Sequence, residues 1–505
     1  MKKLLFMVLA ACAGHYSYAQ QKPNVVIIYA DDLGYGDLGC YGATKVKTPH
    51  IDRLAKEGIR FTNGHTTSAT CTPSRFAMLT GKYPWRKSGT GVLPGDAAMI
   101  VPVDKPSLAT LMQKGGYATA LVGKWHLGLG DGRTIDWNGE VRPSPNDVGF
   151  DYSFCFPATA DRVPTVFLEN HTVLGLDKDD PIEVNYRQKV GNDPTGKENP
   201  ELLKMASSPG QGHNNTIVNG IGRIGFMKGG HKARWTDEEL AYAFTERAEK
   251  FIEDNRANPF FLYFALSDIH VPRMPGTAFK GQSGLGYRGD AILQMDWTVG
   301  RIMQKLQQLG LEKNTIVIFS SDNGPVLDDG YQDGAVTQLN GHKQAGPLRG
   351  GKYSAFEGGT RVPWIVRWPA KVKGGQTSDA LISQVDLFAS FARLTSQPLA
   401  ADDAPDSFDM LDALTGKDGK GRPWLILQGG ALSLVQGSLK YITPSKGPKV
   451  AKEVDIELGN DTEPQLYDLK KDIGEQQNIA AQFPEKVKAM AAELERLKAA
   501  DKTRK

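Results

Sequence analysis

Side chains with hard oxygen ligands stand directly after two apolar runs of this chain. Asp31 and Asp32 follow one run, and Asp322 and Asn323 follow another much further along. Carboxylate and amide oxygens suit Ca²⁺ or Mg²⁺ and do not suit Zn²⁺. A pair of aspartates after a strand can also simply cap a turn, but the four residues together favour a divalent-cation site. Such a cation could counter negative charge on a bound reacting group.

One cysteine of the chain needs a chemical explanation. Beyond Cys12, which lies in the N-terminal apolar stretch, only Cys40, Cys71 and Cys155 remain. This odd number in a chain with an export signal argues against a disulfide framework. Use of Cys71 as a reactive group, with Cys40 and Cys155 as small buried apolar side chains, accounts for the count. The alternative for Cys71 is a buried or free thiol in a turn.

Cationic and imidazole side chains accompany this cysteine. Cys71 is the first and Arg75 the last residue of the sequence Cys-Thr-Pro-Ser-Arg. A helix that starts near Ser74 would turn Arg75 and the first-turn amides toward Cys71. Lys124 and His126 alternate along an extended segment, so both can point to one side. The alternatives are a surface arginine and a structural histidine bonded to the backbone.

Predicted strands that end in polar residues alternate with predicted helices. In a mostly parallel sheet, ligands bind beyond the carboxyl ends of the strands, so residues after separate strands, His270 among them, converge. The predicted fold is α/β, with a large mostly parallel or mixed sheet between helices and a smaller C-terminal antiparallel sheet plus helix. We expect strands at 24–29, 118–122, 260–266, 315–319 and 362–368, and helices at 49–58, 74–79, 107–114, 236–254, 289–309 and 484–499.

Local composition divides the chain into segments. Residues 1–19 read as a signal peptide, because Lys2 and Lys3 precede a short apolar stretch and a small-x-small cleavage site ends at Ala19. Residues 20–414 are expected to form a catalytic domain, and residues 415–505 a C-terminal α+β subdomain. Residues 157–235 are rich in Gly, Asn and Pro, and we interpret them as an insertion that walls a substrate pocket.

Charge and hydropathy limit the partners. The net charge of the 505 residues is only +3 although 23% of them are charged, so nothing points to nucleic acid or to a membrane surface. No segment is long and apolar enough for a membrane span. The signal peptide predicts a periplasmic or secreted protein. Cleavage before Cys12 would instead give a lipid-anchored lipoprotein.

Six short motifs together resemble the type I, formylglycine-dependent sulfatase family, which is arylsulfatase-like and belongs to the alkaline phosphatase superfamily. They occur in the family's order at 29–36, 71–75, 123–128, 320–324, 349–352 and 465–469. The resemblance implies an alkaline-phosphatase-like α/β sandwich. It also implies sulfate-ester hydrolysis, in which a hydrated formylglycine made from Cys71 takes the sulfuryl group and sulfate is then eliminated.

The resemblance also assigns roles to single residues. It implies that Asp31, Asp32, Asp322 and Asn323 hold one Ca²⁺ together with the matured Cys71, and that Arg75 supports the nucleophile. By the same resemblance, Lys124 and Lys352 bind sulfate, His126 contacts the formylglycine hydroxyl, and His270 protonates the leaving alkoxide. Many members carry a second histidine where this chain has Arg273, which leaves the role of Arg273 open.

The substrate is the less constrained part of the prediction. Export and the polar insertion favour a sulfated carbohydrate, with a preference for a galactose or N-acetylgalactosamine type of sugar. We expect His171, Arg162 and Arg349 to contact the sugar, although they also read as solvated loop residues. A formylglycine-generating maturation enzyme is an expected partner. The alternatives are a phosphate or phosphonate ester hydrolase of the same superfamily and a glycan-binding protein without catalysis.

Overall fold

Four parallel strands form the centre of the molecule. The structure is a computed structural model that describes residues 22–504. Strand β1 (Asn24–Ala30) lies between β12 (Phe260–Ala265) and β13 (Thr315–Ser321), and β4 (Ala118–Lys124) pairs with the far side of β12. These strands are apolar and almost entirely buried because both faces of the sheet are covered. Their carboxyl ends therefore meet at one edge.

Further strands extend this sheet on both sides and make it mixed. Its ten strands lie in the order β15-β2-β14-β13-β1-β12-β4-β5-β6-β7, with β14 antiparallel to β13 and β6 antiparallel to β5. The predicted large mixed sheet is thus confirmed. The outer strands are β2 (Ile59–Phe61), β14 (Trp364–Arg367), β15 (Gln376–Ser378), β5 (Tyr152–Phe156), β6 (Leu168–Glu169) and β7 (Thr172–Val173).

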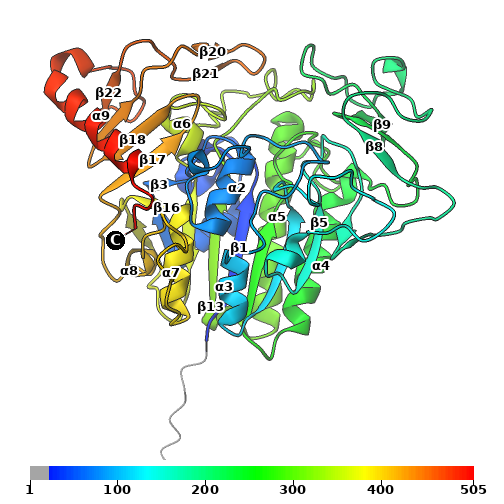
Figure 1. Cartoon of the computed structure of the whole chain (residues 1–505), viewed down its shortest axis with the longest axis horizontal. Helices are drawn as coiled ribbons and strands as arrows, with labels where there is room; N and C mark the ends of the chain where they lie inside the picture. The colour runs from blue at the N-terminus through cyan, green and yellow to red at the C-terminus, as the bar shows by residue number, and fades with distance from the viewer. Residues whose placement is uncertain (1–21, 505) are drawn as a thin grey trace, which may run out of the picture.

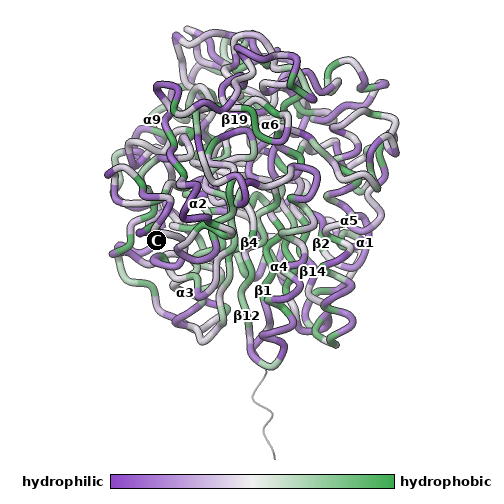
Figure 2. Tube along the Cα trace, turned by 90° about the vertical axis from the view of Figure 1, so that its right-hand side faces the viewer, coloured by the Kyte–Doolittle hydropathy of each residue, from purple (hydrophilic) through white to green (hydrophobic). Residues whose placement is uncertain are grey.

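Helices cover both faces of the sheet, and Figure 2 shows the green, hydrophobic central strands among more hydrophilic helices. Alternate residues of β1 enter different cores: Val25 and Ile27 face one, and Val26 and Ile28 face the other. Helices α2 (Cys71–Thr80), α3 (Leu108–Lys114) and α7 (Leu387–Leu394) pack on the first face. Helices α1 (Pro49–Glu57), α4 (Leu240–Asp254) and α5 (Gly286–Gln308) pack on the second.

A second, antiparallel sheet follows near the C-terminus, as predicted. Its strands lie in the order β17-β18-β19-β22, and α9 packs on it. Figure 1 shows this part, orange to red, beside the upper edge of the central sheet. The elements are β17 (Trp424–Gln428), β18 (Leu432–Gln436), β19 (Leu439–Ile442), β22 (Gln465–Asp468) and α9 (Pro484–Ala499), with the hairpin β20 (Val450–Ala451) and β21 (Ile456–Glu457) before β22.

The segment 157–235 lies on the other side of that edge in Figure 1. Apart from one turn of 3-10 helix at Pro200–Leu202, its regular structure consists of short strands. Besides β6 and β7, these are β8 (Glu183–Asn185), β9 (Ile217–Val218), β10 (Ile221–Gly222) and β11 (Phe226–Lys228). The short elements elsewhere are β3 (Gly64–His65), β16 (Ile382–Ser383), α6 (Glu357–Thr360) and α8 (Leu411–Leu414).

Helix α2 begins earlier than the sequence predicts. Its first helical residue is Cys71 and not Ser74, because Thr70 is still extended. Pro73 then falls in the first turn, where an amide has no intrahelical acceptor and proline costs little. The shift places Cys71 itself at the amino end of the helix.

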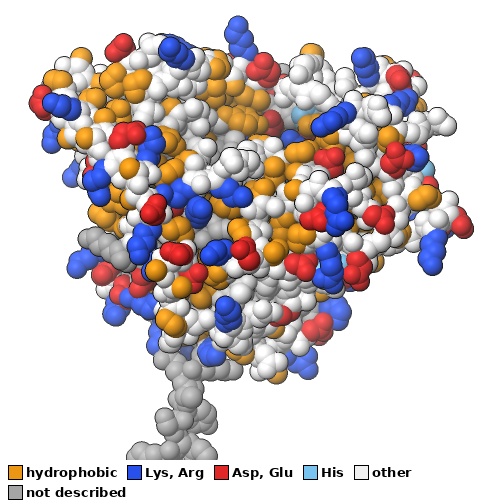
Figure 3. All heavy atoms as spheres, in the orientation of Figure 1, with side chains coloured by type: hydrophobic (Ala, Val, Ile, Leu, Met, Phe, Trp, Pro, Cys, Tyr) orange, Lys and Arg blue, Asp and Glu red, His pale blue; other side chains and the backbone are white. Residues whose placement is uncertain are grey.

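The predicted signal peptide and the possible lipidation site at Cys12 concern where the protein is located in or outside the cell. The predicted signal peptide and Cys12 lie outside the described residues. Across residues 22–504, none of the helices has the length and apolar character that a membrane crossing requires. On the face drawn in Figure 3, acidic and basic side chains are interspersed.

Candidate active site

Cys71 lies at the carboxyl edge of the central strands. The amino end of α2 carries it there, and its side chain is 1% exposed. Burial raises the pKa of this thiol above its usual range, although the ammonium groups of Lys124 and Lys352 pull it down. An unmodified Cys71 is therefore protonated at neutral pH and a poor nucleophile.

The four predicted oxygen ligands converge beside it. Asp31 and Asp32 come from the end of β1, and Asp322 and Asn323 from the end of the adjacent β13. The Asn323 side-chain amide donates a 2.7 Å hydrogen bond to Asp32 Oδ1, and the Asp32 backbone N–H donates to Asp322 Oδ1 at 3.3 Å. Ligand atoms of Asp31, Asp32 and His270 all lie within 4.8 Å of one another.

Two oxygens of this cluster have no hydrogen-bond partner among residues 22–504. They are Asp31 Oδ1 and Asn323 Oδ1, and both are buried. A buried acceptor without a partner is costly, so a ligand that uses it is favoured. A divalent cation with a preference for oxygen fits this donor set. Burial raises the pKa of Asp31 well above its usual range, with Asp322 adding to the effect, which a bound cation would reverse.

Three buried cations surround these carboxylates. Arg75 donates two hydrogen bonds to Asp322 Oδ2, at 2.9 and 2.7 Å. Lys124 Nζ lies 2.5 Å from Asp31 Oδ2, and Lys352 Nζ lies 2.9 Å from Asp32 Oδ2. Arg75 thus contacts an acidic residue of the cluster, and its predicted support of the nucleophile at Cys71 stays a prediction.

Two buried histidines complete the cluster. The Nδ1–H of His270 donates to the Val271 carbonyl at 2.7 Å, which leaves Nε2 facing Asp32 Oδ2 at 3.8 Å. The Nε2–H of His126 donates to the Leu93 carbonyl at 2.9 Å, and its Nδ1 has no partner in the part of the chain that the structure describes. Burial lowers the pKa of both imidazoles well below the usual range, and nearby lysines lower it further.

The backbone at this edge is unusual in a way that the sequence does not reveal. Asp32 and His126 have φ values of 57° and 56°, which is a left-handed backbone conformation that residues other than glycine rarely adopt. Each such residue costs roughly 1–3 kcal/mol and persists at sites where the surroundings hold it. At Gly123, φ is 109° and a Cβ would lie 1.8 Å from the Ala265 carbonyl oxygen, so only glycine fits there.

A cavity of about 460 Å³ opens over Cys71. Segment 157–235 forms one wall and the β20–β21 hairpin another, so parts far apart in sequence enclose it. The walls include four residues that sequence reasoning missed: Asp161, His213, Asp329 and Tyr353. The cavity is lined by Cys71, Val92, Asp161, Arg162, Gly210, Gln211, His213, Ile224, His270, Asp329, Lys352, Tyr353, Ala451, Glu453, Val454 and Leu458.

Of the three predicted sugar contacts, only Arg162 lines this cavity. His171 lies between β6 and β7, where its Nδ1 is 2.9 Å from the Ser144 hydroxyl. Arg349 makes a two-pronged ion pair with Glu457, at 2.7 and 2.8 Å. Both residues are held by neighbours outside the cavity lining.

Arg273, whose role the sequence left open, is a buried structural link. It donates to Asp333 at 2.6 Å and to the Val326, Leu327 and Ile269 carbonyls. It therefore ties the segment after β12 to the loop after β13.

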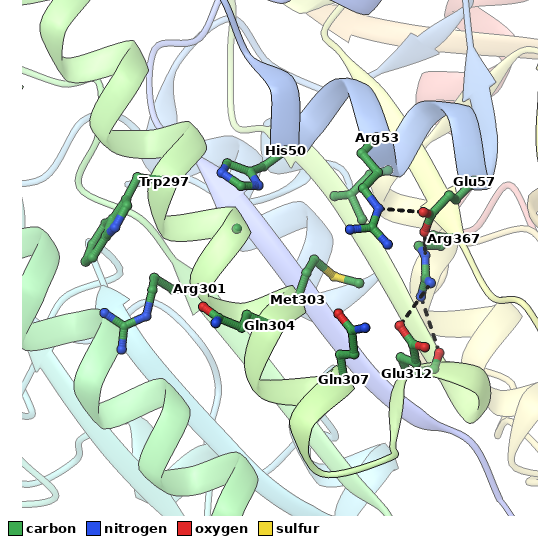
Figure 4. A pocket seen from close by; sticks show the side chains of 12 residues that line it. His50, Arg53, Glu57, Trp297, Arg301, Met303, Gln304, Gln307, Glu312 and Arg367 are labelled. Carbon is green, nitrogen blue, oxygen red and sulfur yellow. Dashed lines mark hydrogen bonds and ion pairs between the residues drawn. The ribbon is translucent and has the colours of Figure 1, made fainter.

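A different cavity lies between α1 and α5, away from the carboxyl edge. Its volume is about 360 Å³, and Figure 4 shows Arg53, Glu57, Arg367 and Glu312 joined in one chain of interactions on one side of it. Glu57 binds both Arg53 and Arg367, at 2.6 and 2.8 Å. Its lining holds three arginines and two glutamates but neither a cysteine nor an aspartate, so it differs from the cluster around Cys71.

The fold and the site define an α/β protein whose buried site is suited to an anionic ligand. Buried lysine and arginine side chains surround a cluster of carboxylates that could hold a divalent cation, and all of these groups lie at the edge where sheets of this kind bind ligands.

Comparisons with known proteins narrow this class. The family model described as Sulfatase matches residues 23–397. The N-acetylgalactosamine-6-O-sulfatase of Bacteroides thetaiotaomicron is 56% identical over 480 residues, which cover 95% of this chain and 93% of that protein. Human arylsulfatase A is 32% identical over 512 residues, which cover 98% of this chain and 90% of that protein. The chain belongs to the sulfatase family, and it is a sulfuric ester hydrolase.

A solved structure agrees with this assignment. It comes from a study of the metabolism of multiple glycosaminoglycans by Bacteroides thetaiotaomicron. It superposes with a TM-score of 0.93 and 55% identity, covering 95% of this chain and 100% of its own. The alkaline-phosphatase-like fold predicted from the motifs is consistent with this result.

Proposed function

We propose that this chain is a calcium-dependent, formylglycine-bearing sulfatase that removes the 6-sulfate of an N-acetylgalactosamine-type sugar. The observation that carries the proposal is the 56% identity to an N-acetylgalactosamine-6-O-sulfatase along 95% of the chain. The cavity over Cys71 supports it, because a pocket of this size that combines apolar walls with a few charged groups suits one sugar bearing a sulfate group.

Charge balance supports an anionic ligand. The carboxylates of Asp31, Asp32 and Asp322 are paired with Arg75, Lys124 and Lys352. Asp329 also pairs with Lys352, so the cluster holds four carboxylates against three cations. A Ca²⁺ held by Asp31, Asp32, Asp322 and Asn323 would leave the site with an excess positive charge and would stabilise charge on sulfate oxygens.

The mechanism assigns each buried group a task. Cys71 would be converted to formylglycine by a maturation enzyme, and its hydrate supplies the attacking oxygen. Lys124 and Lys352 hold the sulfate oxygens. His126, whose Nδ1 has no partner within the described residues, can accept a proton from the hydrate. His270 lines the cavity with Nδ1–H held by the Val271 carbonyl; Nε2 would take up a proton when the anionic substrate binds and would pass that proton to the departing sugar oxygen.

Replacing His270 with alanine is expected to slow sugar desulfation by about 10²–10⁴-fold. A sugar alkoxide is a poor leaving group and needs that proton, whereas 4-nitrophenolate does not. Release of 4-nitrophenol from its sulfate ester should therefore fall far less. His231→Ala is the control, because His231 is 59% exposed and bonded to Asp180. Equal losses with both substrates would contradict the assigned role.

Arg162 is the residue we expect to contact the sugar. Its Nη1 is held by Asp161 at 2.9 Å, and Asp161 also accepts from His213 at 3.0 Å, so the guanidinium is fixed in the cavity wall. Arg162→Ala should raise KM for the sulfated sugar by roughly 10–100-fold, because a hydrogen bond from a charged group contributes about 1.5–3 kcal/mol. Turnover of 4-nitrophenyl sulfate should change little.

Arg349→Ala is the matched control for that variant. The Arg349 guanidinium is occupied by Glu457 and the Glu475 carbonyl, so KM for the sugar should stay unchanged. A larger KM effect at Arg349 than at Arg162 would mean that the cavity assignment is wrong.

Location and domain limits stay predictions. We propose export directed by residues 1–19, with lipidation at Cys12 as the alternative. We also propose the catalytic domain 20–414, its pocket insertion 157–235 and the C-terminal subdomain 415–505. Wall residues contributed by 157–235 and by the β20–β21 hairpin support the insertion and suggest that both domains shape the pocket.

The direct test compares three esters of one sugar. Matured protein should release sulfate from N-acetylgalactosamine 6-sulfate at least about 100-fold faster than from the 4-sulfate, and should release little phosphate from the 6-phosphate. Faster phosphate release would favour the phosphate ester hydrolase alternative. Tight binding of the 6-sulfate without turnover would favour the glycan-binding alternative.

A further inference from the structure

Asp329 is an acidic residue in a cavity proposed to receive an anion. It lies in the loop after β13 and lines the cavity over Cys71. Its Oδ2 accepts a hydrogen bond from Lys352 Nζ at 2.7 Å, and its Oδ1 accepts one from the Tyr353 hydroxyl at 3.2 Å. Both oxygens of the carboxylate are therefore engaged by two consecutive residues of another loop.

The charge of Asp329 by itself would disfavour sulfate binding. Burial raises the pKa of this carboxyl, but the ammonium of Lys352 outweighs burial and holds the pKa below its usual range. An ionised carboxylate near a sulfate oxygen repels it. A carboxylate at this position therefore needs a role that offsets its repulsion of sulfate. The contact of Asp329 with Lys352 indicates that this role concerns Lys352.

Lys352 needs such an anchor. A lysine side chain is a point charge on a flexible four-carbon stem, so a single partner leaves its direction loosely defined. Its other partner, Asp32, is one of the residues proposed to hold the cation. Asp329 is the partner of Lys352 that has no second task in the mechanism.

The backbone around Lys352 is also fixed. The Lys352 N–H donates to the Pro325 carbonyl at 2.9 Å, and the Tyr353 N–H donates to the Ala69 carbonyl at 2.8 Å. Ala69 lies two residues before Cys71. Tyr353 has φ 76°, a left-handed conformation that is kept only where the surroundings enforce it. The loop that carries Lys352 is thus tied to the segment that carries Cys71.

We propose that Asp329 is a positioning residue that directs the Lys352 ammonium at the sulfate group, and that the Tyr353 hydroxyl holds Asp329 in place. This inference rests on the proposed function, because it assumes that Lys352 binds sulfate. It identifies a determinant of sulfate binding that applies to every substrate, whatever sugar carries the sulfate.

The test uses Asp329→Asn, because two explanations predict opposite signs. If Asp329 acts only through its charge, its neutralisation should strengthen binding of inorganic sulfate. If Asp329 positions Lys352, the inhibition constant for inorganic sulfate should rise about tenfold. In that case kcat/KM should fall by a similar factor for both 4-nitrophenyl sulfate and the sulfated sugar. Tyr353→Phe removes one hydrogen bond to Asp329 and should give a smaller loss of the same sign.

Asp328→Asn is the matched control. Asp328 is adjacent to Asp329 and outside the cavity lining, and its Oδ1 accepts from Ser208, Gln211 and the Gly330 N–H. Asparagine keeps that oxygen and removes the same unit of charge one residue away. The inhibition constant of inorganic sulfate for this variant should stay within about threefold of the value for the unchanged protein. Urea unfolding of each variant checks that folding is retained.

Two results would overturn the inference. One is an inhibition constant of inorganic sulfate for the Asp329→Asn variant that is equal to or lower than that for the unchanged protein. The other is a loss restricted to the sulfated sugar, with 4-nitrophenyl sulfate unaffected. Since both readouts work without the sugar, a protein that fails to cleave N-acetylgalactosamine 6-sulfate would refute the proposed substrate and leave the Asp329 result interpretable.

Discussion

Replacement of Cys71 by alanine is expected to reduce sulfate release from every substrate by at least about 10³-fold, because it removes the precursor of the proposed nucleophile. Neither lysine nor histidine nearby can supply an equivalent attacking oxygen. The fold should survive, since Cys71 forms no disulfide and the change removes one buried atom at the start of α2. Sulfate release from matured protein, measured by ion chromatography, checks the expectation.

Cys155→Ala is the matched control for that experiment. Cys155 is also a free, fully buried cysteine, but it lies in β5 within an apolar core and not at the cavity. Its replacement should lower stability slightly and leave turnover unchanged. The mass of the Cys71 peptide in the unchanged protein gives an independent readout, which should match an aldehyde in place of a thiol. Activity retained by Cys71→Ala would refute the formylglycine mechanism.

The cluster around Cys71 was predictable because it obeys a local rule. Asp31, Asp322 and His270 each follow a buried parallel strand, and the carboxyl ends of such strands meet whatever the rest of the fold does. The apolar runs that mark those strands are readable from the sequence. The alternation of Lys124 and His126 at the end of β4 was readable for the same reason.

The cavity wall was not predictable in the same way. His213 lies in a segment without hydrophobic periodicity, and its hydrogen bond to Asp161 joins residues that only the tertiary structure brings together. His171 and Arg349 have suitable chemistry, yet Ser144 and Glu457 hold them elsewhere. A side chain's type indicates what it can bind, whereas competition among neighbours decides what it does bind.

The buried contact between the C-terminal sheet and helix α6 carries a separate expectation about stability. Lys440 lies in β19 of the C-terminal sheet and is 0% exposed. Its ammonium lies 3.0 Å from Glu357 in α6 and 3.0 Å from Glu475. Arg361 and His65 also lie beside Glu357, at 3.0 and 3.9 Å. Because water is excluded, each charge depends on the others.

The pKa values of the two glutamates differ accordingly. Burial raises both, but Lys440 outweighs burial at Glu357 and holds its pKa below the usual range. At Glu475, burial and the nearby Glu357 raise the pKa to about 7 from the usual 4.5. Folding therefore takes up a proton at Glu475. Stability from this group is complete below pH 4.5 and is lost as the pH rises through about 7.

Lys440→Met is expected to lower the free energy of unfolding by about 3–5 kcal/mol at pH 8, because it leaves two buried carboxylates with too little compensating charge. At pH 5 the loss should be smaller, since without Lys440 the pKa values of both glutamates rise and protons neutralise them. Urea unfolding at the two pH values measures the difference. Lys449→Met is the control, because its ion pair with Asp461 is largely exposed and contributes at most about 1 kcal/mol. A loss at Lys440 that is the same at pH 5 and pH 8 would show that packing, and not buried charge, joins the C-terminal sheet to the loop that carries Lys352.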